Sequence, residues 1–391
     1  MAKLAVPDGR PAAKGLVSAQ LWLPRDDGKR VTCGEFAAVL IVRNEERSLS
    51  RCLRSLSGVV DRFVVLDTGS NDSTVEIARA HGAVVGHFDW CDDFAAARNA
   101  ALDLADADWN LVVDADEWLI DGHEALSARV AGGDVAVGTV RVRSSSLADG
   151  VPVSTTTVSE RFLPRGVRFH GAIHEQARHV LAVHDLDVTL GHDGYEPAQA
   201  EQKRGRNERL LREALTRDSC NPYLRYQLAK ELQAQSRYDE SSAAFDVACE
   251  AAPAQASWRH SLVVRAVSVH GKARRFAAAI ALVDGENTRW DSSPDWHFAL
   301  GNLFLDMALA DPGSAIQLMP LVEASWLRCL EIGERPDLDG AVEGRGSHLA
   351  AHNLAGFYES LGHVAAAQRF RSLATVATAA NSATPQSLPC R

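Results

Sequence analysis

An acidic triplet, Asp114-Ala115-Asp116, follows directly on the apolar run Leu111-Val112-Val113. An apolar run that ends in acids is typical of a buried strand that carries carboxylates to the edge of a sheet. Two carboxylates one residue apart can share a hard cation such as Mg²⁺, which commonly links one or two such groups to substrate phosphates. The triplet therefore predicts a metal site, and the alternative is an acidic turn that caps the next helix.

Two further polar clusters stand where strand-like stretches end. Arg43-Asn44-Glu45 follows the stretch 37–42, and Asp67 follows the stretch 63–66. The carboxyl ends of parallel strands lie on one edge of a sheet, and open α/β sheets bind ligands in the crevice at that edge. These clusters and the acidic triplet are therefore expected to meet in one crevice.

Glycine-rich phosphate loops are missing from the sequence. A dinucleotide-binding fold needs G-x-G-x-x-G after its first strand, because bare backbone must approach the pyrophosphate. That place holds Val42-Arg43-Asn44-Glu45-Glu46-Arg47, and no G-x-x-x-x-G-K-[ST] loop occurs elsewhere. Phosphates, if they bind, must be held by a metal and side chains, which agrees with the paired carboxylates.

The first part of the chain alternates strand-like and helix-like stretches. The strand-like runs are residues 37–42, 63–66, 83–85 and 111–113. This alternation predicts an α/β domain with a mostly parallel sheet covered by helices on both faces. Residues 135–144 then alternate with period two, and residues 161–175 contain short β-like pieces. We expect them to add antiparallel strands to the sheet.

Beyond about residue 200 the pattern becomes helical. Residues 221–253 form a helix–turn–helix with the Tyr, Leu-Ala, Tyr, Ala-x-x-Phe and Pro spacing of a tetratricopeptide unit, which is about 34 residues long. Weaker copies begin at Ser293 and Ser347, and residues 258–286 have room for another pair. Stacked hairpins of this kind form either a buttress or dimerisation arm, or a concave surface that holds an extended partner.

Length and composition set the remaining bounds. A chain of 391 residues with 46% hydrophobic residues predicts two globular domains. The net charge of -10 argues against a broad nucleic-acid-binding face. The seven cysteines include no C-x-x-C pair, which favours a reducing cytoplasm. The sequence contains no run of about 18 apolar residues, so it predicts no membrane span. The predicted parts are a loose extension (1–34), an α/β domain (35–200), a helical domain (201–380) and a flexible tail (381–391).

Four segments in order resemble the successive signatures of family 2 glycosyltransferases. They are residues 41–46, 64–74, 92–99 and 111–117. The closer resemblance is to the bacterial subgroup with a C-terminal tetratricopeptide region, which includes peptide S-glycosyltransferases of the sublancin type. It extends over residues 36 to about 210 and, in architecture only, over the helical tail. It implies a GT-A fold and metal-dependent, inverting transfer from a nucleotide-diphosphate-sugar, with UDP as the expected nucleotide.

The resemblance also implies roles for the residues at the strand ends. Asp116 would bind Mn²⁺ or Mg²⁺ directly, and Asp114 would contact the ribose or a metal-bound water. Asp67 would contact the base or ribose, with a helix-capping turn as the alternative. The remaining donor-binding positions, which line the nucleoside pocket or reach the nucleotide, are Arg43, Asn44, Glu45 and Arg98.

The segment 169–175 resembles the His-Glu signature of the same subgroup. Inverting transfer needs a base that deprotonates the acceptor as it attacks. Glu175 is the candidate base, and His174 would orient the acceptor or the leaving diphosphate. His192 could complete the metal shell. Other possibilities for the base are Glu117 and Asp116, and the alternative for Glu175 is a structural ion pair with Arg161 or Arg168.

The predicted partners are a nucleotide-sugar donor and a peptide or glycan acceptor. The helical region suggests a peptide side chain (Cys, Ser or Thr) or a homodimer, and a lipid-linked or envelope glycan is the rival acceptor. Trp258, Trp290, Trp296 and Trp326 could line an acceptor groove, although tryptophans in such repeats more often form the core. Two other classes stay open, a nucleotidyltransferase and a non-catalytic scaffold.

Overall fold

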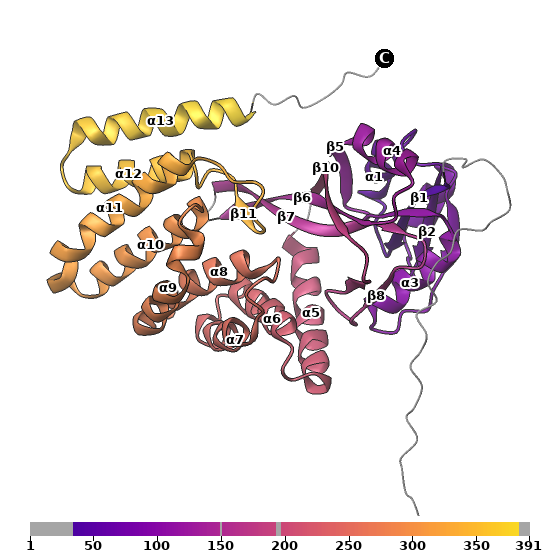
Figure 1. The fold of residues 1–391 in the computed structure, drawn as a ribbon, viewed down its shortest axis with the longest axis horizontal. Coiled ribbons are helices and arrows are strands. Elements are labelled where there is room, and N and C mark those ends of the chain that lie inside the picture. The colour runs from indigo at the N-terminus through magenta and orange to yellow at the C-terminus, as the bar shows by residue number, and fades with distance from the viewer. Residues whose placement is uncertain (1–33, 149–150, 193–196, 383–391) are drawn as a thin grey trace, which may run out of the picture. The chain divides into compact units, whose positions relative to one another are not determined.

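The computed structural model describes residues 34–148, 151–192 and 197–382. A mixed sheet of nine strands dominates its first half (Figure 1). The strands are β1 (Phe36–Val42), β2 (Arg62–Asp67), β3 (Val84–His87), β4 (Trp109–Val112), β5 (Glu117–Asp121), β6 (Val137–Ala148), β7 (Val151–Pro164), β10 (Val183–His192) and β11 (Ala341–Val342). Their order is β3-β2-β1-β4-β7-β6-β10-β5, with β11 beside β7.

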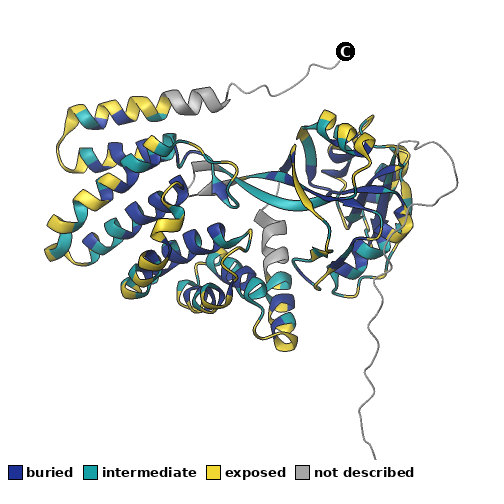
Figure 2. Cartoon of the chain, in the orientation of Figure 1, coloured by how far each residue is buried: buried dark blue, intermediate teal, exposed yellow. Residues whose placement is uncertain are grey.

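Strand β1 explains why the first strands read as continuous apolar runs. Phe36, Ala38 and Leu40 lie in a core with α1 (Leu49–Ser55) and α4 (His123–Gly132). Ala37 and Val39 lie in a second core with α3 (Phe94–Ala105). Both faces of the strand are therefore removed from water, as expected of a parallel strand in an α/β sheet. Figure 2 shows buried residues, in dark blue, along the strands of the sheet.

The prediction of a mostly parallel sheet with appended strands is confirmed, with one correction. β1 pairs in parallel with β2 and β4, and β2 with β3. The added strands pair antiparallel at β4–β7, β6–β7 and β5–β10, but β6 and β10 run parallel. Period-two alternation reports the face of a side chain and not the direction of the neighbouring strand, so this pairing could not be predicted.

The second half consists of helices that follow one another as hairpins (Figure 1). After α2 (Thr74–Ala80) in the sheet region, the helices are α5 (Pro197–Arg217), α6 (Pro222–Ala234), α7 (Tyr238–Ala251), α8 (Arg259–Lys272), α9 (Phe276–Trp290), α10 (Pro294–Ala310), the 3₁₀ turn η1 (Pro312–Ser314), α11 (Ala315–Ile332), α12 (His348–Ser360) and α13 (Val364–Ser382). The predicted hairpins at 221, 293 and 347 are present, and so is the further pair after Trp258.

Sequence signals set the helix starts in this region. Asn221 and Ser293 accept backbone N–H bonds as N-caps, and each is followed by a proline at the first helical position. Trp296 is fully buried and Trp326 is 2% exposed, so both belong to the repeat core. Trp258, by contrast, lines a cavity described below.

A segment of the helical half pairs with the sheet. β11 adds to β7, the N–H of Gly340 donates to the carbonyl of Thr156 (3.0 Å), and the N–H of Glu343 donates to that of Ser154 (2.8 Å). The predicted division near residue 200 therefore stays a prediction, and the predicted extension and tail lie, except for residues 34, 381 and 382, outside the described residues. In the described part of the chain, no helix is long and apolar enough to cross a membrane.

Candidate active site

The carboxyl ends of the central strands meet at one edge of the sheet, as predicted. Val42 is in register with Asp67, and the N–H of Thr68 donates to the carbonyl of Val42 (2.9 Å). The N–H of Val113 likewise donates to the carbonyl of Val39 (3.2 Å), which places the acidic triplet beside β1. A cavity of about 1240 Å³ opens at this edge, and its lining includes the triplet, Arg43 and side chains from the helical half.

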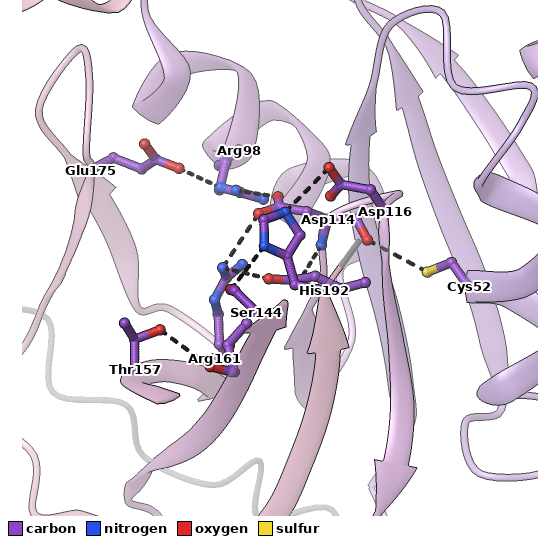
Figure 3. Close-up of polar contacts among 11 residues, drawn as sticks. Cys52, Arg98, Asp114, Asp116, Ser144, Thr157, Arg161, Glu175 and His192 are labelled. Carbon is purple, nitrogen blue, oxygen red and sulfur yellow. Dashed lines mark hydrogen bonds and ion pairs between the residues drawn. The ribbon is translucent and has the colours of Figure 1, made fainter. Parts of the chain in front are cut away.

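Two arginines bind the Asp114 carboxylate (Figure 3). Oδ1 accepts a hydrogen bond from Nη2 of Arg98 (2.6 Å), and Oδ2 lies 3.3 Å from Nη2 of Arg161. Burial opposes ionisation, but the two guanidinium groups hold the pKa of Asp114 well below its usual range. Asp114 is therefore an ionised anchor for both arginines, which lessens its suitability as a direct metal ligand.

Glu117 is buried directly beside Asp114. Its Oε2 accepts the N–H of Asp114 (2.8 Å), and its Oε1 lies 3.2 Å from Nη2 of Arg161. Burial, together with the negative charge of Asp114, raises the pKa of Glu117 to about 7 against the opposing charge of Arg161. Both carboxylate oxygens hold the turn of the triplet, so Glu117 is badly placed to act as a base on a substrate.

Asp116 faces His192, the last residue of β10. Strand pairing places His192 opposite Glu117 on β5 and Ser144 on β6. Its Nε2 lies 3.3 Å from Oδ2 of Asp116, and its Nδ1 lies 2.9 Å from Oγ of Ser144 (Figure 3). Burial lowers the pKa of His192, but the hydrogen bond and charge of Asp116 outweigh it and raise that pKa.

The pair of Asp116 and His192 has the donor atoms that the predicted divalent ion requires. Within the described ranges, no group of three or more His, Cys, Asp or Glu side chains is gathered to hold a metal. Mg²⁺ and similar ions usually keep several waters and bind through one or two protein ligands plus substrate phosphates. Carboxylate and imidazole donors 3.3 Å apart, one in the turn before β5 and the other at the end of β10, suit that mode. Asp116 and His192 therefore fit a divalent ion whose remaining ligands would come from the substrate and water.

The predicted nucleoside side of the site is held together by loop–loop hydrogen bonds. Oδ1 of Asn44 accepts the N–H of Asn71 (2.9 Å), and the N–H of Glu45 donates to the hydroxyl of Thr74 (2.7 Å). Arg43 is exposed, and all three predicted residues line the cavity. The backbone at Asn44 has φ 57°, which asparagine tolerates better than most residues.

Asp67 is 3% exposed and does not belong to the cavity lining. Its carboxylate accepts the N–H groups of Gly69 (3.2 Å) and Ser70 (3.1 Å) and lies 3.3 Å from Nδ1 of His87. The geometry is that of the turn alternative, with the side chain closing the loop after β2. A contact between Asp67 and the nucleoside stays a prediction.

The His174-Glu175 segment connects β8 (Arg168–His170) and β9 (Gln176–Arg178), and it is anchored from the helical half. Ile173 is buried in the core of the first helical hairpins, and the carbonyl of Ala172 accepts the N–H of Phe94 (2.9 Å). Glu175 Oε1 then accepts a hydrogen bond from Nε of Arg98 (2.5 Å). The ion-pair partner of Glu175 is therefore Arg98. The sequence had suggested Arg161 or Arg168 for this role.

His174 is an unusual residue in this segment. Its backbone has φ 49°, and its Nε2 is buried with no hydrogen-bond partner among the described residues. Burial, and to a lesser extent the charge of Lys230, lowers the pKa of His174 to about 3. A neutral imidazole with an open nitrogen thus borders the cavity next to Glu175.

Several residues of the cavity wall were not singled out from sequence. Arg161 was named only as a possible partner of Glu175, and Ser144 was not named at all. The wall from the helical half carries four further residues that were not named, Tyr223, Tyr226, Lys230 and Arg265, beside Trp258, which was. The i, i+3, i+7 spacing of the three α6 residues was a usable signal for one helix face, but not for what that face would meet.

The sequence is similar to a known family and to several known proteins. Residues 37–177 match the model of the family described as "Glycosyl transferase family 2". A TPR repeat-containing protein of Synechococcus elongatus is 43% identical over 137 residues, which cover 35% of this chain and 34% of that protein. The SPbeta prophage-derived glycosyltransferase SunS of Bacillus subtilis is 26% identical over 226 residues, which cover 56% and 52%.

The chain thus spans between a third and about half of the length of these relatives. Among solved structures, glucosyl-3-phosphoglycerate synthase from Mycobacterium tuberculosis, in complex with Mn²⁺, UDP and glucosyl-3-phosphoglycerate, is 24% identical. The match covers 28% of this chain and 44% of that one, with a TM-score of 0.24, a likeness too small to carry an argument.

Proposed function

We propose that this chain, which carries a glycosyltransferase family 2 domain of the GT-A fold followed by tetratricopeptide-like helices, transfers a sugar from a nucleotide-diphosphate-sugar to an acceptor with inversion. UDP is the proposed nucleotide. The observation that carries the proposal is the meeting of Asp116, His192 and Arg98 in one cavity at the carboxyl edge of the sheet. This set combines metal-ligand atoms with a fixed cation, which suits a diphosphate leaving group.

On the donor side, Arg98 is the residue best placed to bind a phosphate. Two of its nitrogens bind Glu175 and Asp114, and Nη1 is buried without a partner among the described residues. A buried donor of this kind is costly unless a ligand satisfies it. Asp116 and His192 would hold the Mn²⁺ or Mg²⁺ ion, whose charge would offset the negative charge that develops on the departing diphosphate.

On the acceptor side, Glu175 is the proposed base. The acceptor oxygen or sulfur would attack the anomeric carbon as its proton passes to Glu175, and the bond between that carbon and the diphosphate would break with its electron pair leaving on the nucleotide. The hydrogen bond from Nε of Arg98 to Oε1 (2.5 Å) fixes the position of the Glu175 carboxylate in the cavity wall. His174, which is neutral and directly precedes Glu175 in the chain, would form one hydrogen bond with the sugar acceptor, either as donor or as acceptor.

Glu175→Gln is expected to lower kcat for acceptor-dependent nucleotide release by about 10²- to 10⁴-fold, because the amide cannot take the proton. Steady-state nucleotide release with a transferable acceptor measures the effect. Glu160→Gln is the matched control, since Glu160 lines the same cavity but pairs with His179 (3.1 Å). A Glu175→Gln enzyme with activity within a few-fold of wild type would return the base to Asp116 or another group.

The proposal as a whole is tested with a panel of nucleotide sugars in the presence of Mn²⁺ or Mg²⁺, with and without EDTA. We expect nucleotide release from one donor class, and release that falls to background when EDTA removes the ion. Parallel reactions with nucleoside triphosphates test the nucleotidyltransferase alternative, which would release pyrophosphate instead. Release from no donor would favour a non-catalytic scaffold, and release unaffected by EDTA would contradict metal dependence.

The proposed acceptor is a peptide side chain bearing a hydroxyl or thiol. The resemblance of the sequence to the tetratricopeptide-bearing subgroup that includes peptide S-glycosyltransferases supports this assignment, and SunS is similar to this chain over 56% of the chain's length. A lipid-linked or envelope glycan is the alternative acceptor. A homodimer formed through the helices and a cytoplasmic location stay predictions.

A further inference from the structure

The helical half supplies a polar and aromatic wall to the same cavity that contains the acidic triplet. Its cations are Arg206 on α5, Lys230 on α6 and Arg265 on α8, and its aromatic residues are Tyr223, Tyr226 and Trp258. The rings of Tyr226 and Trp258 stack with centroids 5.4 Å apart and planes 11° apart. None of these groups takes part in the proposed sugar transfer.

The cations of α8 differ in their partners along the helix. Arg259, at the start of the helix, forms an ion pair with Glu286, and Lys272, at its end, lies 3.5 Å from Asp306. Arg265 lies between them and faces the cavity, where its Nη1 donates to the neutral amide oxygen of Gln233 (3.1 Å). Arg265, which borders the cavity, is therefore paired with a neutral amide, whereas Arg259 and Lys272 are each paired with a carboxylate.

Lys230 has a similar environment. Its Nζ donates to the amide oxygen of Gln227 (3.1 Å) and lies 5.2 Å from the centre of the Tyr226 ring. Burial and the neighbouring Arg265 lower the pKa of Lys230 to about 8, against the charges of Asp339 and Glu231. Among the described residues no carboxylate forms an ion pair with either cation. Two neighbouring cations in a recessed wall that no carboxylate contacts directly are unfavourable unless an anion joins them.

Asp339 also borders the cavity, but its contacts are directed elsewhere. Its Oδ1 accepts the N–H of Val158 (3.4 Å), and its carbonyl oxygen lies 2.7 Å from Nδ1 of His260. Burial raises the pKa of Asp339, so its negative charge is itself disfavoured at this place. The charge of Asp339 would therefore repel an anion bound at this wall, but its carboxylate does not pair directly with Lys230 or Arg265.

We infer that Lys230 and Arg265 bind an anionic group, a carboxylate or a phosphate, on the sugar acceptor. The inference rests on the proposed function. Lys230 and Arg265 line the same cavity as His174 and the proposed base Glu175, so an anionic group on the acceptor can reach them. The stacked Tyr226 and Trp258 shield the wall from water and so strengthen attraction between the cations and an anion.

Anion binding to the full chain saturated with UDP and Mn²⁺ tests this inference. The probes are inorganic phosphate and acetate, titrated by isothermal calorimetry, and the stronger of the two identifies the class of anion. We expect saturable binding to wild type that weakens at least about ten-fold in Lys230→Met and in Arg265→Gln, the loss of roughly one charge-assisted contact. Asp339→Asn should strengthen binding, because it removes an opposing charge.

Lys272→Met is the matched control, because this lysine lies on the same helix as Arg265 and pairs with Asp306; it should bind the anion as wild type does. No saturable binding of either anion to wild type, or equal binding by all the variants, would overturn the inference. UDP binding is measured first on the same sample. Failure of UDP to bind would count against the proposed function, whereas UDP binding without anion binding would count against this inference alone.

Discussion

Replacement of Asp116 by alanine is expected to lower kcat for nucleotide release by about 10³-fold or more, with the fold intact. Asp116 presents Oδ2 to His192 at 3.3 Å, and the pair is the candidate divalent-ion site of the cavity. Loss of the carboxylate would leave the developing charge of the diphosphate without its main compensation, an effect of several kcal/mol on the barrier. Steady-state kinetics, circular dichroism and the melting temperature together measure the two halves of the prediction.

Two further variants sharpen this test. Asp116→Asn keeps the size of the side chain but removes its charge, and it should be nearly as inactive as Asp116→Ala. Glu124→Ala removes an exposed carboxylate at the start of α4 and should behave as wild type. If Asp116→Ala kept more than about a tenth of the wild-type activity, a loss of less than 1.4 kcal/mol, its role as a metal ligand would be wrong.

Replacement of Arg98 by methionine is expected to lower the free energy of unfolding by about 3–5 kcal/mol. The Arg98 side chain is 8% exposed and bridges Asp114 (2.6 Å) and Glu175 (2.5 Å), which come from the sheet and from the loop anchored in the helices. Without the guanidinium, Glu175 loses its cation, while Asp114 keeps only Arg161 (3.3 Å). Urea denaturation followed by circular dichroism measures the change.

The control for Arg98 is Arg168→Met. Arg168 pairs with Asp103 at 2.6 Å, but both side chains are more than a third exposed, so its removal should cost no more than about 1 kcal/mol. The double variant Arg98→Met/Glu175→Gln should recover part of the lost stability, because it removes the charge of Glu175 that the loss of Arg98 leaves without a cation. Equal destabilisation by the Arg98 and Arg168 variants would show that the bridge is not the source of the effect.

Local sequence patterns were sufficient for much of this architecture. The apolar run of β1, buried on both faces, and the acids that end β4 predicted a parallel sheet with a polar edge. Asn221 and Ser293, each followed by proline, marked helix starts that the structure contains. These signals act over a few residues, since strand burial and helix capping depend on the local chain.

The partners of the site residues depended on tertiary structure. His192 meets Asp116 only because β10 lies between β5 and β6, a pairing across some 70 residues that side-chain alternation does not encode. Arg98 joins Asp114 to Glu175 only because Ile173 is held in the helical core. The sequence by itself determined which residues reach the edge of the sheet, because that follows from strand ends. The tertiary structure decided which charges face each other there. Ion pairs form between segments that are far apart in the chain, and their separation in sequence does not indicate whether they come into contact.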